Sequence, residues 1–158
     1  MIVKQLNILL ADDDMDDCSF FEEALKGFLL PTNFTAVHNG EQLMMLLTNT
    51  TYQLPHVIFL DLNMPRKNGF ECLCEIKLNE KLKQVPVIIF STSFEQEVVN
   101  RLYKSEAQYF IRKPADFGQF KNIIDKALTV IAQENFLQPV REKFVLTIEE
   151  SINMQTVE

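Results

Sequence analysis

The sequence contains no apolar run long enough to cross a membrane or to form the core of a signal peptide. The apolar segment near the amino terminus is only ILLA, whereas a transmembrane helix needs about 20 such residues. Basic clusters are also lacking, and 22 acidic against 15 basic side chains give a net charge of −7. An acidic chain of this kind binds nucleic acid and anionic membranes poorly. These absences predict a cytoplasmic protein that binds neither nucleic acid nor membrane.

Cysteine is scarce, and the three that occur are Cys18, Cys72 and Cys74. Cys72 and Cys74 are two residues apart, so they do not form a CxxC motif, and at this spacing they would not share one face of a helix. We therefore interpret the cysteines as small apolar residues of a reducing compartment. The 158 residues contain no internal repeat or low-complexity tract, and this length fits one domain.

Strand-like and helix-like segments alternate along the chain. Short apolar runs predict strands at 5–11, 33–39, 56–61, 85–91 and 107–113. Helical spacing of apolar residues predicts helices at 15–28, 40–49, 69–79, 94–106 and 117–134. Ser93 with Gln96 is expected to cap the fourth helix and Asp116 the fifth. This alternation predicts an α/β fold: a doubly wound, five-stranded parallel sheet with helices on both faces.

The carboxyl-terminal part of the chain falls outside these five units. We expect residues 1–134 to form the domain and residues 135–158 to be an extension without a separate domain. Within the extension, KFVLTI at 143–148 is expected to form a short strand or docking segment. The remainder is interpreted as a frayed tail.

Polar side chains follow the predicted strands at the points where they end. In chain order these are Asp12, Asp13, Asp61, Asn63, Ser91 and Lys113. Parallel strands bring such ends to one edge of the sheet, where doubly wound folds bind their ligands. Mg²⁺ prefers oxygen ligands, an ammonium suits a phosphoryl oxygen, and an aspartate can form an aspartyl phosphate. The cluster therefore predicts metal-assisted phosphoryl transfer to Asp61.

Four segments in this order resemble the receiver domain of two-component response regulators: ILLADDDMDD, VIFLDLNMPRKNGFE, VPVIIFSTS and YFIRKPADFGQF. They lie between about residues 5 and 132. The first and last are most similar to bacterial stand-alone receivers of the type that partners bacteriophytochromes. The resemblance implies a flavodoxin-like (βα)5 fold and a phosphoprotein.

The resemblance also implies a phosphoacceptor and a metal site. Asp61 would accept the phosphoryl group. Mg²⁺, with Mn²⁺ as a substitute, would be bound by Asp13, Asp61 and the backbone carbonyl of Asn63, and by Asp12 through water. The other acids of the first segment are interpreted as cap and first-turn residues of the helix, and these are Asp14, Asp16 and Asp17.

Further residues match the switch of the family. Ser91 would be the switch hydroxyl, where threonine is commoner, and Phe110 the switch aromatic. Phe110 lacks a hydroxyl, and the neighbouring Tyr109 is expected to point outward. Lys113 would bind the phosphoryl group, and its peptide bond to Pro114 would be cis.

The partners implied by the resemblance are proteins. A sensor histidine kinase, of phytochrome type or hybrid type, would donate the phosphoryl group. The surface formed by residues 94–132 would change on phosphorylation and bind a downstream protein, a phosphotransfer protein or a second copy of the chain. The chain would then be a single-domain response regulator that catalyses only its own phosphorylation and dephosphorylation, and is not otherwise an enzyme.

Other functions fit part of the pattern. A phosphohydrolase of the haloacid dehalogenase type also uses a strand-end aspartate and Mg²⁺, but it carries a second aspartate where this sequence has Asn63. A scaffold receiver that is never phosphorylated is disfavoured by the presence of Asp12, Asp13, Asp61 and Lys113. Alternatively, the chain could be a phosphorelay intermediate, which accepts the phosphoryl group on Asp61 and passes it to another protein.

Overall fold

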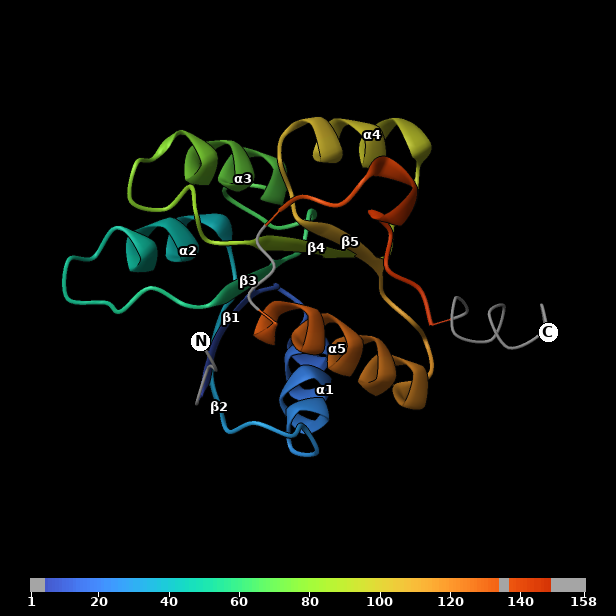
Figure 1. Ribbon diagram of the computed structural model, residues 1–158. Coiled ribbons are helices and arrows are strands. Elements are labelled where there is room, and N and C mark those ends of the chain that lie inside the picture. The colour runs from blue at the N-terminus through green and yellow to red at the C-terminus, as the bar shows by residue number, and fades with distance from the viewer. Residues whose placement is uncertain (1–4, 134–136, 149–158) are drawn as a thin grey trace.

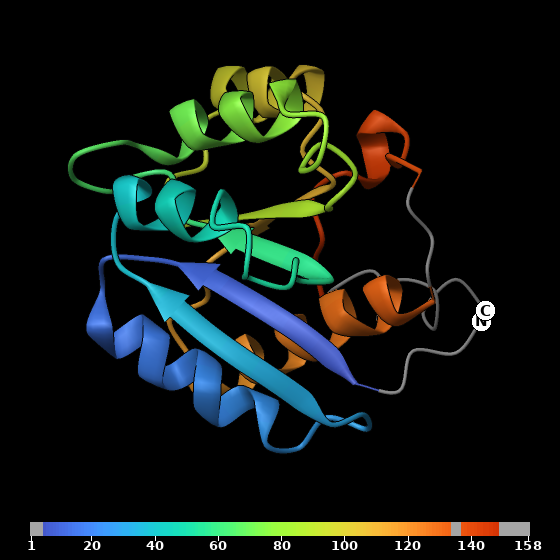
Figure 2. The same cartoon turned by 90° about the vertical axis from the view of Figure 1, so that its left-hand side faces the viewer.

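Five parallel strands form one sheet in the computed structural model, which describes residues 5–133 and 137–148 (Figure 1). The strands are β1 (Leu6–Ala11), β2 (Thr32–Val37), β3 (Val57–Leu60), β4 (Val87–Ser91) and β5 (Tyr109–Arg112). Their order in the sheet is β2-β1-β3-β4-β5, and every neighbouring pair is parallel. Figure 2 shows β1 and β2 side by side, with their arrowheads at the same end. The order reverses between β1 and β3, which is where such folds bind ligands.

Helices cover both faces of the sheet, so the predicted doubly wound fold is confirmed. They are α1 (Met15–Leu25), α2 (Gly40–Leu47), α3 (Gly69–Leu78), α4 (Gln96–Lys104) and α5 (Phe117–Ala132). Helices α1 and α5 lie on one face, and α2, α3 and α4 lie on the other (Figure 1). No helix of the described residues is both long enough and apolar enough to span a bilayer.

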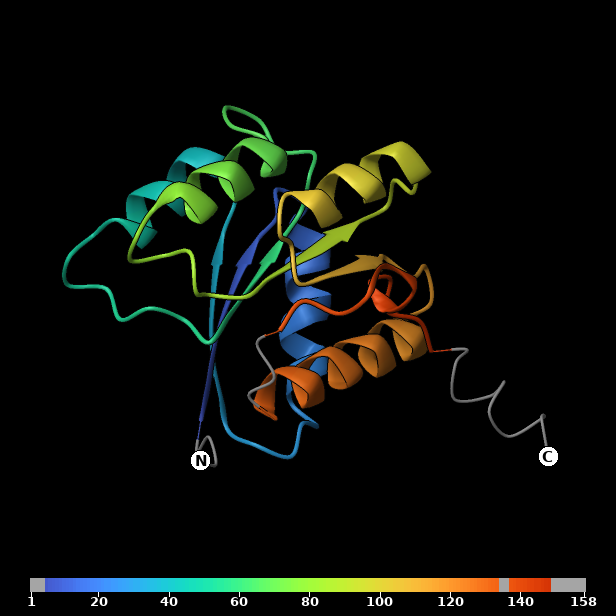
Figure 3. The same ribbon diagram turned by 45° about the horizontal axis from the view of Figure 1, so that its top comes forward.

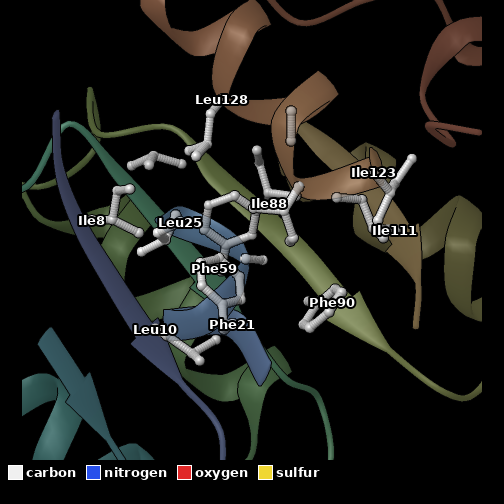
Figure 4. Packing of buried hydrophobic residues seen from close by; sticks show 14 of the residues in the cluster. Ile8, Leu10, Phe21, Leu25, Phe59, Ile88, Phe90, Ile111, Ile123 and Leu128 are labelled. Carbon is white, nitrogen blue, oxygen red and sulfur yellow. The ribbon is translucent and has the colours of Figure 1, made fainter. Parts of the chain in front are cut away.

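Two apolar cores, one on each face of the sheet, pack the helices against the strands. The core beneath α1 and α5 is rich in aromatic rings: Phe21 lies 4.8 Å from Phe59 and 5.9 Å from Phe90 between ring centroids (Figure 4). In β1, Ile8 and Leu10 face this core, whereas Leu9 faces the core beneath α2, α3 and α4. Successive side chains of a strand point to opposite faces. Because both faces are covered, the central strands read as continuous apolar runs.

Side-chain caps fix the starts of four helices, but the predicted cap of α4 is wrong. Asp116 accepts a hydrogen bond from the backbone N–H of Gly118, as expected for the cap of α5. Helix α4 begins at Gln96, and its N-cap, Glu95, makes no side-chain cap hydrogen bond. The Ser93 N–H instead donates to the Ser91 hydroxyl at 3.2 Å. This local turn keeps the chain out of helical geometry for two more residues.

The segment from 137 to 148, here called the C-terminal strap, packs along the open edge of β5 (Figure 3). The Phe110 N–H donates to the Phe144 carbonyl at 3.0 Å, and the Leu146 N–H donates to the Phe110 carbonyl at 2.9 Å. Phe144 is fully buried, with its ring 5.1 Å from that of Tyr103. KFVLTI therefore docks on the domain as predicted. The rest of the expected tail, from 149 to 158, lies outside the described residues.

Candidate functional site

The predicted site residues converge at the carboxyl edge of the sheet because the strand ladders continue into them. The Asp61 N–H donates to the Ala11 carbonyl at 2.9 Å, which places the residue after β3 beside the end of β1. The Lys113 N–H donates to the Ser91 carbonyl at 2.9 Å, which aligns the ends of β4 and β5. The motifs that are far apart in the sequence therefore meet.

Three carboxylates form the centre of the site. Asp12, Asp13 and Asp61 each contribute an oxygen, and these oxygens all lie within 4.8 Å of one another. Asp12 and Asp61 are buried, whereas Asp13 is exposed. Burial raises the pKa of Asp61 to about 7, and the neighbouring ammonium of Lys113 opposes this rise. Burial also raises the pKa of Asp12. The cluster is therefore short of positive charge.

Lys113 is the cation nearest to these carboxylates, and its side chain is only 7% exposed. Its Nζ lies 2.7 Å from Asp12 Oδ2, 2.8 Å from Asp17 Oδ2 and 3.8 Å from Asp61 Oδ2. Burial alone would lower the pKa of this ammonium, but its pairing with Asp12 and Asp17 outweighs burial and raises the pKa. Lys113 is therefore positively charged, and it already pairs with two carboxylates other than Asp61.

The donor set fits a hard divalent cation. The close approach of Lys113 to Asp12 Oδ2 is an ion pair without hydrogen-bond geometry, and that oxygen is buried with no hydrogen-bond partner among the described residues. The ammonium of Lys113 compensates this oxygen, but it is one cation beside the three carboxylates of the cluster, so negative charge remains that a further cation could balance. Three clustered carboxylate oxygens are the ligand type that Mg²⁺ and Mn²⁺ prefer. The backbone N–H of Asn63 bonds to the Asp61 carboxylate, which ties this residue to the same centre.

Gly69 allows the loop after β3 to fold tightly against Asp61. A Cβ atom at residue 69 would lie 2.2 Å from the Asp61 carbonyl oxygen and 2.8 Å from the Leu62 Cα. The Gly69 N–H donates to the Leu62 carbonyl at 2.9 Å. The capping box of Asn68 and Glu71 then starts α3 directly after this turn. The loop that carries Asp61 is thus anchored by a glycine that has no room for a side chain.

The predicted switch residues lie inside the fold. Ser91 and Phe110 are both completely buried, and the Phe110 ring lies 5.8 Å from that of Phe94. The expectation that Tyr109 points outward is wrong, since this residue is 9% exposed. Its neighbours along β5 alternate between two faces that are both covered by helices, so its ring packs into the core beneath α1 and α5.

The expected cis peptide bond is absent. The described residues contain no cis peptide, so the bond between Lys113 and Pro114 is trans. The trans isomer is the default, favoured by about 0.5–1 kcal/mol even before proline. With this isomer the Lys113 side chain still reaches the carboxylates, and Asp116 still caps α5.

Asp17 is the site contact that the sequence analysis missed. The residue lies in the first turn of α1, where an acid has an ordinary explanation as a partner of the helix dipole. Its carboxylate instead accepts a hydrogen bond from Lys113, which is 96 residues away in the sequence. No local spacing carries this information, because only the tertiary fold brings the first turn of α1 next to the residue that follows β5.

Comparisons with known proteins agree with this geometry. Residues 8–125 match the family model of the response regulator receiver domain. The response regulator Rcp1 of Synechocystis sp. is 33% identical over 110 residues, which cover 67% of this chain and 75% of Rcp1. The crystal structure of the phosphorylated cyanobacterial phytochrome response regulator RcpA superposes with a TM-score of 0.73 at 31% identity, over 78% of this chain and 91% of that one. The Mn²⁺-bound form of Rcp1 superposes with a TM-score of 0.76 at 27% identity, over 85% and 99% of the two chains.

Proposed function

The chain belongs to the response regulator receiver domain family, and on this premise we propose that Asp61 is the residue that becomes phosphorylated. One observation carries the proposal: the Asp61 carboxylate is buried at the carboxyl edge of the sheet, between two further carboxylates and the ammonium of Lys113. A buried nucleophile next to a fixed cation suits the transfer of a negatively charged group.

Asp61 supplies the attacking oxygen in this reaction. A carboxylate oxygen forms a bond to the phosphorus of a phosphohistidine while the bond between phosphorus and the imidazole nitrogen breaks. The imidazole keeps the electron pair of the broken bond and takes up a proton from solvent. Because burial has removed most of the water around the carboxylate, its oxygen is less shielded than that of an exposed aspartate.

The metal that fits this site is Mg²⁺, with Mn²⁺ as a substitute. We assign Asp13, Asp61 and the backbone carbonyl of Asn63 as direct ligands, and Asp12 as a ligand through water. A bound cation would supply charge neutralisation for the phosphoryl oxygens. The three carboxylate oxygens within 4.8 Å of one another support this assignment, as does the relative Rcp1, whose structure was solved with Mn²⁺.

Lys113 and Ser91 complete the binding of the phosphoryl group. The ammonium of Lys113 pairs with one phosphoryl oxygen and the hydroxyl of Ser91 donates to another. A rotation of the Ser91 hydroxyl toward the phosphoryl group would lengthen the bond that its oxygen accepts from the Ser93 N–H, and this would release the loop before α4 from its turn. Phe94 in that loop contacts Phe110, which connects the site to the middle of β5.

The signalling partners follow from the same proposal. A sensor histidine kinase, of phytochrome type or hybrid type, donates the phosphoryl group to the chain in the bacterial cytoplasm. RcpA, described as a cyanobacterial phytochrome response regulator, supports the phytochrome type. The product is a phosphorylated switch that acts by binding and not by turnover of a substrate. A phosphohydrolase is disfavoured because Asn63 stands where an acid–base aspartate would be needed.

The output surface includes α4, α5 and the C-terminal strap. Because the strap covers the edge of β5, a downstream protein, a phosphotransfer protein or a second copy of the chain would contact the strap as well as the helices. Light scattering of the full chain before and after phosphorylation tests the homodimer. A mass that stays monomeric in both states would direct the search toward other protein partners.

The phosphorylation proposal is tested by intact mass spectrometry after incubation with acetyl phosphate. We expect one added phosphoryl group in the presence of Mg²⁺ and none with a chelator. The Asp61→Asn variant is the control, and it is expected to stay unmodified. A folded wild-type protein that stays unmodified with every phosphodonor and kinase tried would favour the scaffold function instead.

A further inference from the structure

Asp17 competes with the proposed reaction for the cation of the site. The carboxylate of Asp17 accepts a hydrogen bond from Lys113 Nζ at 2.8 Å, whereas the same Nζ lies 3.8 Å from Asp61. Asp17 is about one-fifth exposed, so this pair is partly screened by solvent but is fixed in geometry at its lysine end. In the structure the lysine is thus turned toward the helix α1 side of the site.

A lysine that binds a phosphoryl group on Asp61 cannot keep all three of its present contacts. Lys113 holds three N–H donors, of which one points to Asp17 and the ammonium also pairs with Asp12. To contact an oxygen attached beyond Asp61, the ammonium has to move from the side of α1 toward the end of β3. Asp12 and Asp61 follow the paired strands β1 and β3, whereas Asp17 lies on α1, outside the sheet. We therefore expect this movement to break the contact with Asp17.

We propose that Asp17 is a positioning residue that holds the Lys113 ammonium in the resting state and releases it when Asp61 is phosphorylated. The inference rests on the proposed function, because it needs Lys113 to bind the phosphoryl group. A contact made only in the resting state stabilises that state and lowers the affinity for whatever requires its loss. Asp17 therefore sets how strongly the site binds a phosphoryl group.

The contacts of Asp17 make it suitable for a clean substitution. Among the described residues, its carboxylate makes no hydrogen bond or ion pair other than the one with Lys113. The backbone N–H of Asp17 donates to the capping carboxylate of Asp14, and this bond is kept by any side chain at position 17. Asp17→Asn preserves size and fold while it removes the charge that binds the lysine.

Asp16 provides the matched control. It lies one residue earlier in the same turn of α1, carries the same charge and is exposed, and no ion pair of its carboxylate occurs among the described residues. Asp16→Asn removes the same charge from the neighbourhood of the site without touching Lys113. A purely long-range effect of charge would appear in both variants.

The first measurement is the affinity for beryllofluoride in the presence of Mg²⁺, followed by calorimetry, with beryllofluoride as the probe for a phosphoryl group. We expect Asp17→Asn to bind it roughly three- to tenfold more tightly than wild type, within the coupling range of neighbouring residues. Asp16→Asn is expected to change the affinity by less than about twofold. Equal changes in the two variants, or no change in Asp17→Asn, would overturn the proposal.

A double-mutant cycle separates positioning from the charge effect. In a Lys113→Ala background, Asp17 has no ammonium to hold, so Asp17→Asn is expected to leave the beryllofluoride affinity unchanged. If the gain in affinity persisted without the lysine, Asp17 would act through its field and the positioning role would be wrong. Asp17→Glu, which restores the charge, is expected to return the affinity toward that of wild type.

A second readout needs neither metal nor phosphoryl group. A buried, paired ammonium exchanges its protons slowly, so Lys113 Nζ should give an observable proton–nitrogen signal in the metal-free protein. We expect this signal to broaden or disappear in Asp17→Asn and to persist in Asp16→Asn. If wild type fails to bind beryllofluoride yet shows this behaviour, the proposed function fails and the pairing stands. If wild type binds beryllofluoride and the signal is the same in both variants, only the role of Asp17 fails.

Discussion

The carboxyl edge of the sheet and the open edge of β5 are built from opposite kinds of side chain. The first holds the buried charges of Asp12, Asp61 and Lys113, and burial raises the pKa of both carboxyl groups. The second is covered by the C-terminal strap, which adds the fully buried ring of Phe144 and a pair of backbone hydrogen bonds. Without a metal, the buried charges of the first edge therefore lower the stability of the fold, whereas the contacts of the second edge raise it. Removing a buried charge at the carboxyl edge should therefore raise the free energy of unfolding, whereas removing an apolar side chain of the strap should lower it.

The largest effect is expected at the strap. Phe144→Ala removes a ring that is 0% exposed, and the loss of a buried phenylalanine side chain costs about 3–5 kcal/mol. Urea denaturation measures this decrease in the free energy of unfolding. Val140→Ala is the control in the same segment, since Val140 is 62% exposed and is expected to change stability by no more than about 0.5 kcal/mol. Equal stability of the two variants would mean that the strap does not pack on β5 in solution.

Asp61→Asn should raise the free energy of unfolding in metal-free buffer, whereas Phe144→Ala lowers it. The pKa of Asp61 is 3.8 in its unperturbed state and about 7 in the fold, so between these values the folded protein binds more protons than the unfolded chain. Stability then falls as the pH rises from about 4 to about 7, because the proton is lost from a buried site. At pH 8 the variant is expected to be more stable than wild type by about 2–4 kcal/mol, and at pH 4 to differ little.

Denaturation of the two proteins at both pH values measures this difference. Asp16→Asn, an exposed acid in the first turn of α1, should show neither the gain nor its pH dependence. Saturating Mg²⁺ should reduce the difference by stabilising wild type. A variant less stable than wild type at pH 8 would contradict the view that the carboxyl edge costs stability.

Gly69 and Gly118 differ in how much room they leave for a side chain. Gly69→Ala forces a Cβ to within 2.2 Å of the Asp61 carbonyl oxygen, so the loop has to shift, at a cost of about 1–3 kcal/mol. The shift moves Asp61, and slower phosphorylation by acetyl phosphate is expected alongside the loss of stability. At Gly118 in α5 the nearest atom to an added Cβ is 3.6 Å away, and Gly118→Ala should be neutral or slightly stabilising. Normal phosphorylation of a destabilised Gly69→Ala would show that the loop position is not critical.

The smallest effect concerns one polar contact of the strap. The hydroxyl of Tyr103 in α4 donates to the Pro139 carbonyl at 2.7 Å. Tyr103→Phe is expected to lower the free energy of unfolding by about 1 kcal/mol, the usual net value of one hydrogen bond. Phosphorylation by acetyl phosphate should be unchanged, since the contact lies away from the carboxylates. A strong loss of phosphorylation would mean that the two edges are coupled.

Much of the fold could be predicted from sequence because both faces of the sheet are covered. Full burial makes β1, β3 and β4 continuous apolar runs, and these runs were found within two residues of their actual ends. The edge strand β2 is only partly buried, and its predicted range was shifted by one residue at its start and two at its end. The start of α4 was missed because the hydroxyl of Ser91 competes for the backbone N–H of Ser93.

The site was predictable where its residues directly follow strands, and not where they depend on tertiary contacts. The convergence of Asp61 and Lys113 at one edge could be predicted because each lies immediately after a strand and within a recognisable motif. Asp17 could not, because its contact with Lys113 arises from chain packing across the sheet. The covering of β5 also escaped prediction in detail, since a short apolar segment such as KFVLTI does not specify which edge it joins.

The most direct test of the central claim is to locate the phosphoryl group by chemical trapping. Borohydride reduces an aspartyl phosphate to homoserine, and tryptic peptides of the protein treated with acetyl phosphate and Mg²⁺ then identify the residue. We predict homoserine at position 61 alone, in wild type and in Asp16→Asn. Homoserine at Asp12 or Asp13, or its appearance in Asp61→Asn at the wild-type level, would contradict the assignment of Asp61 as the phosphoacceptor.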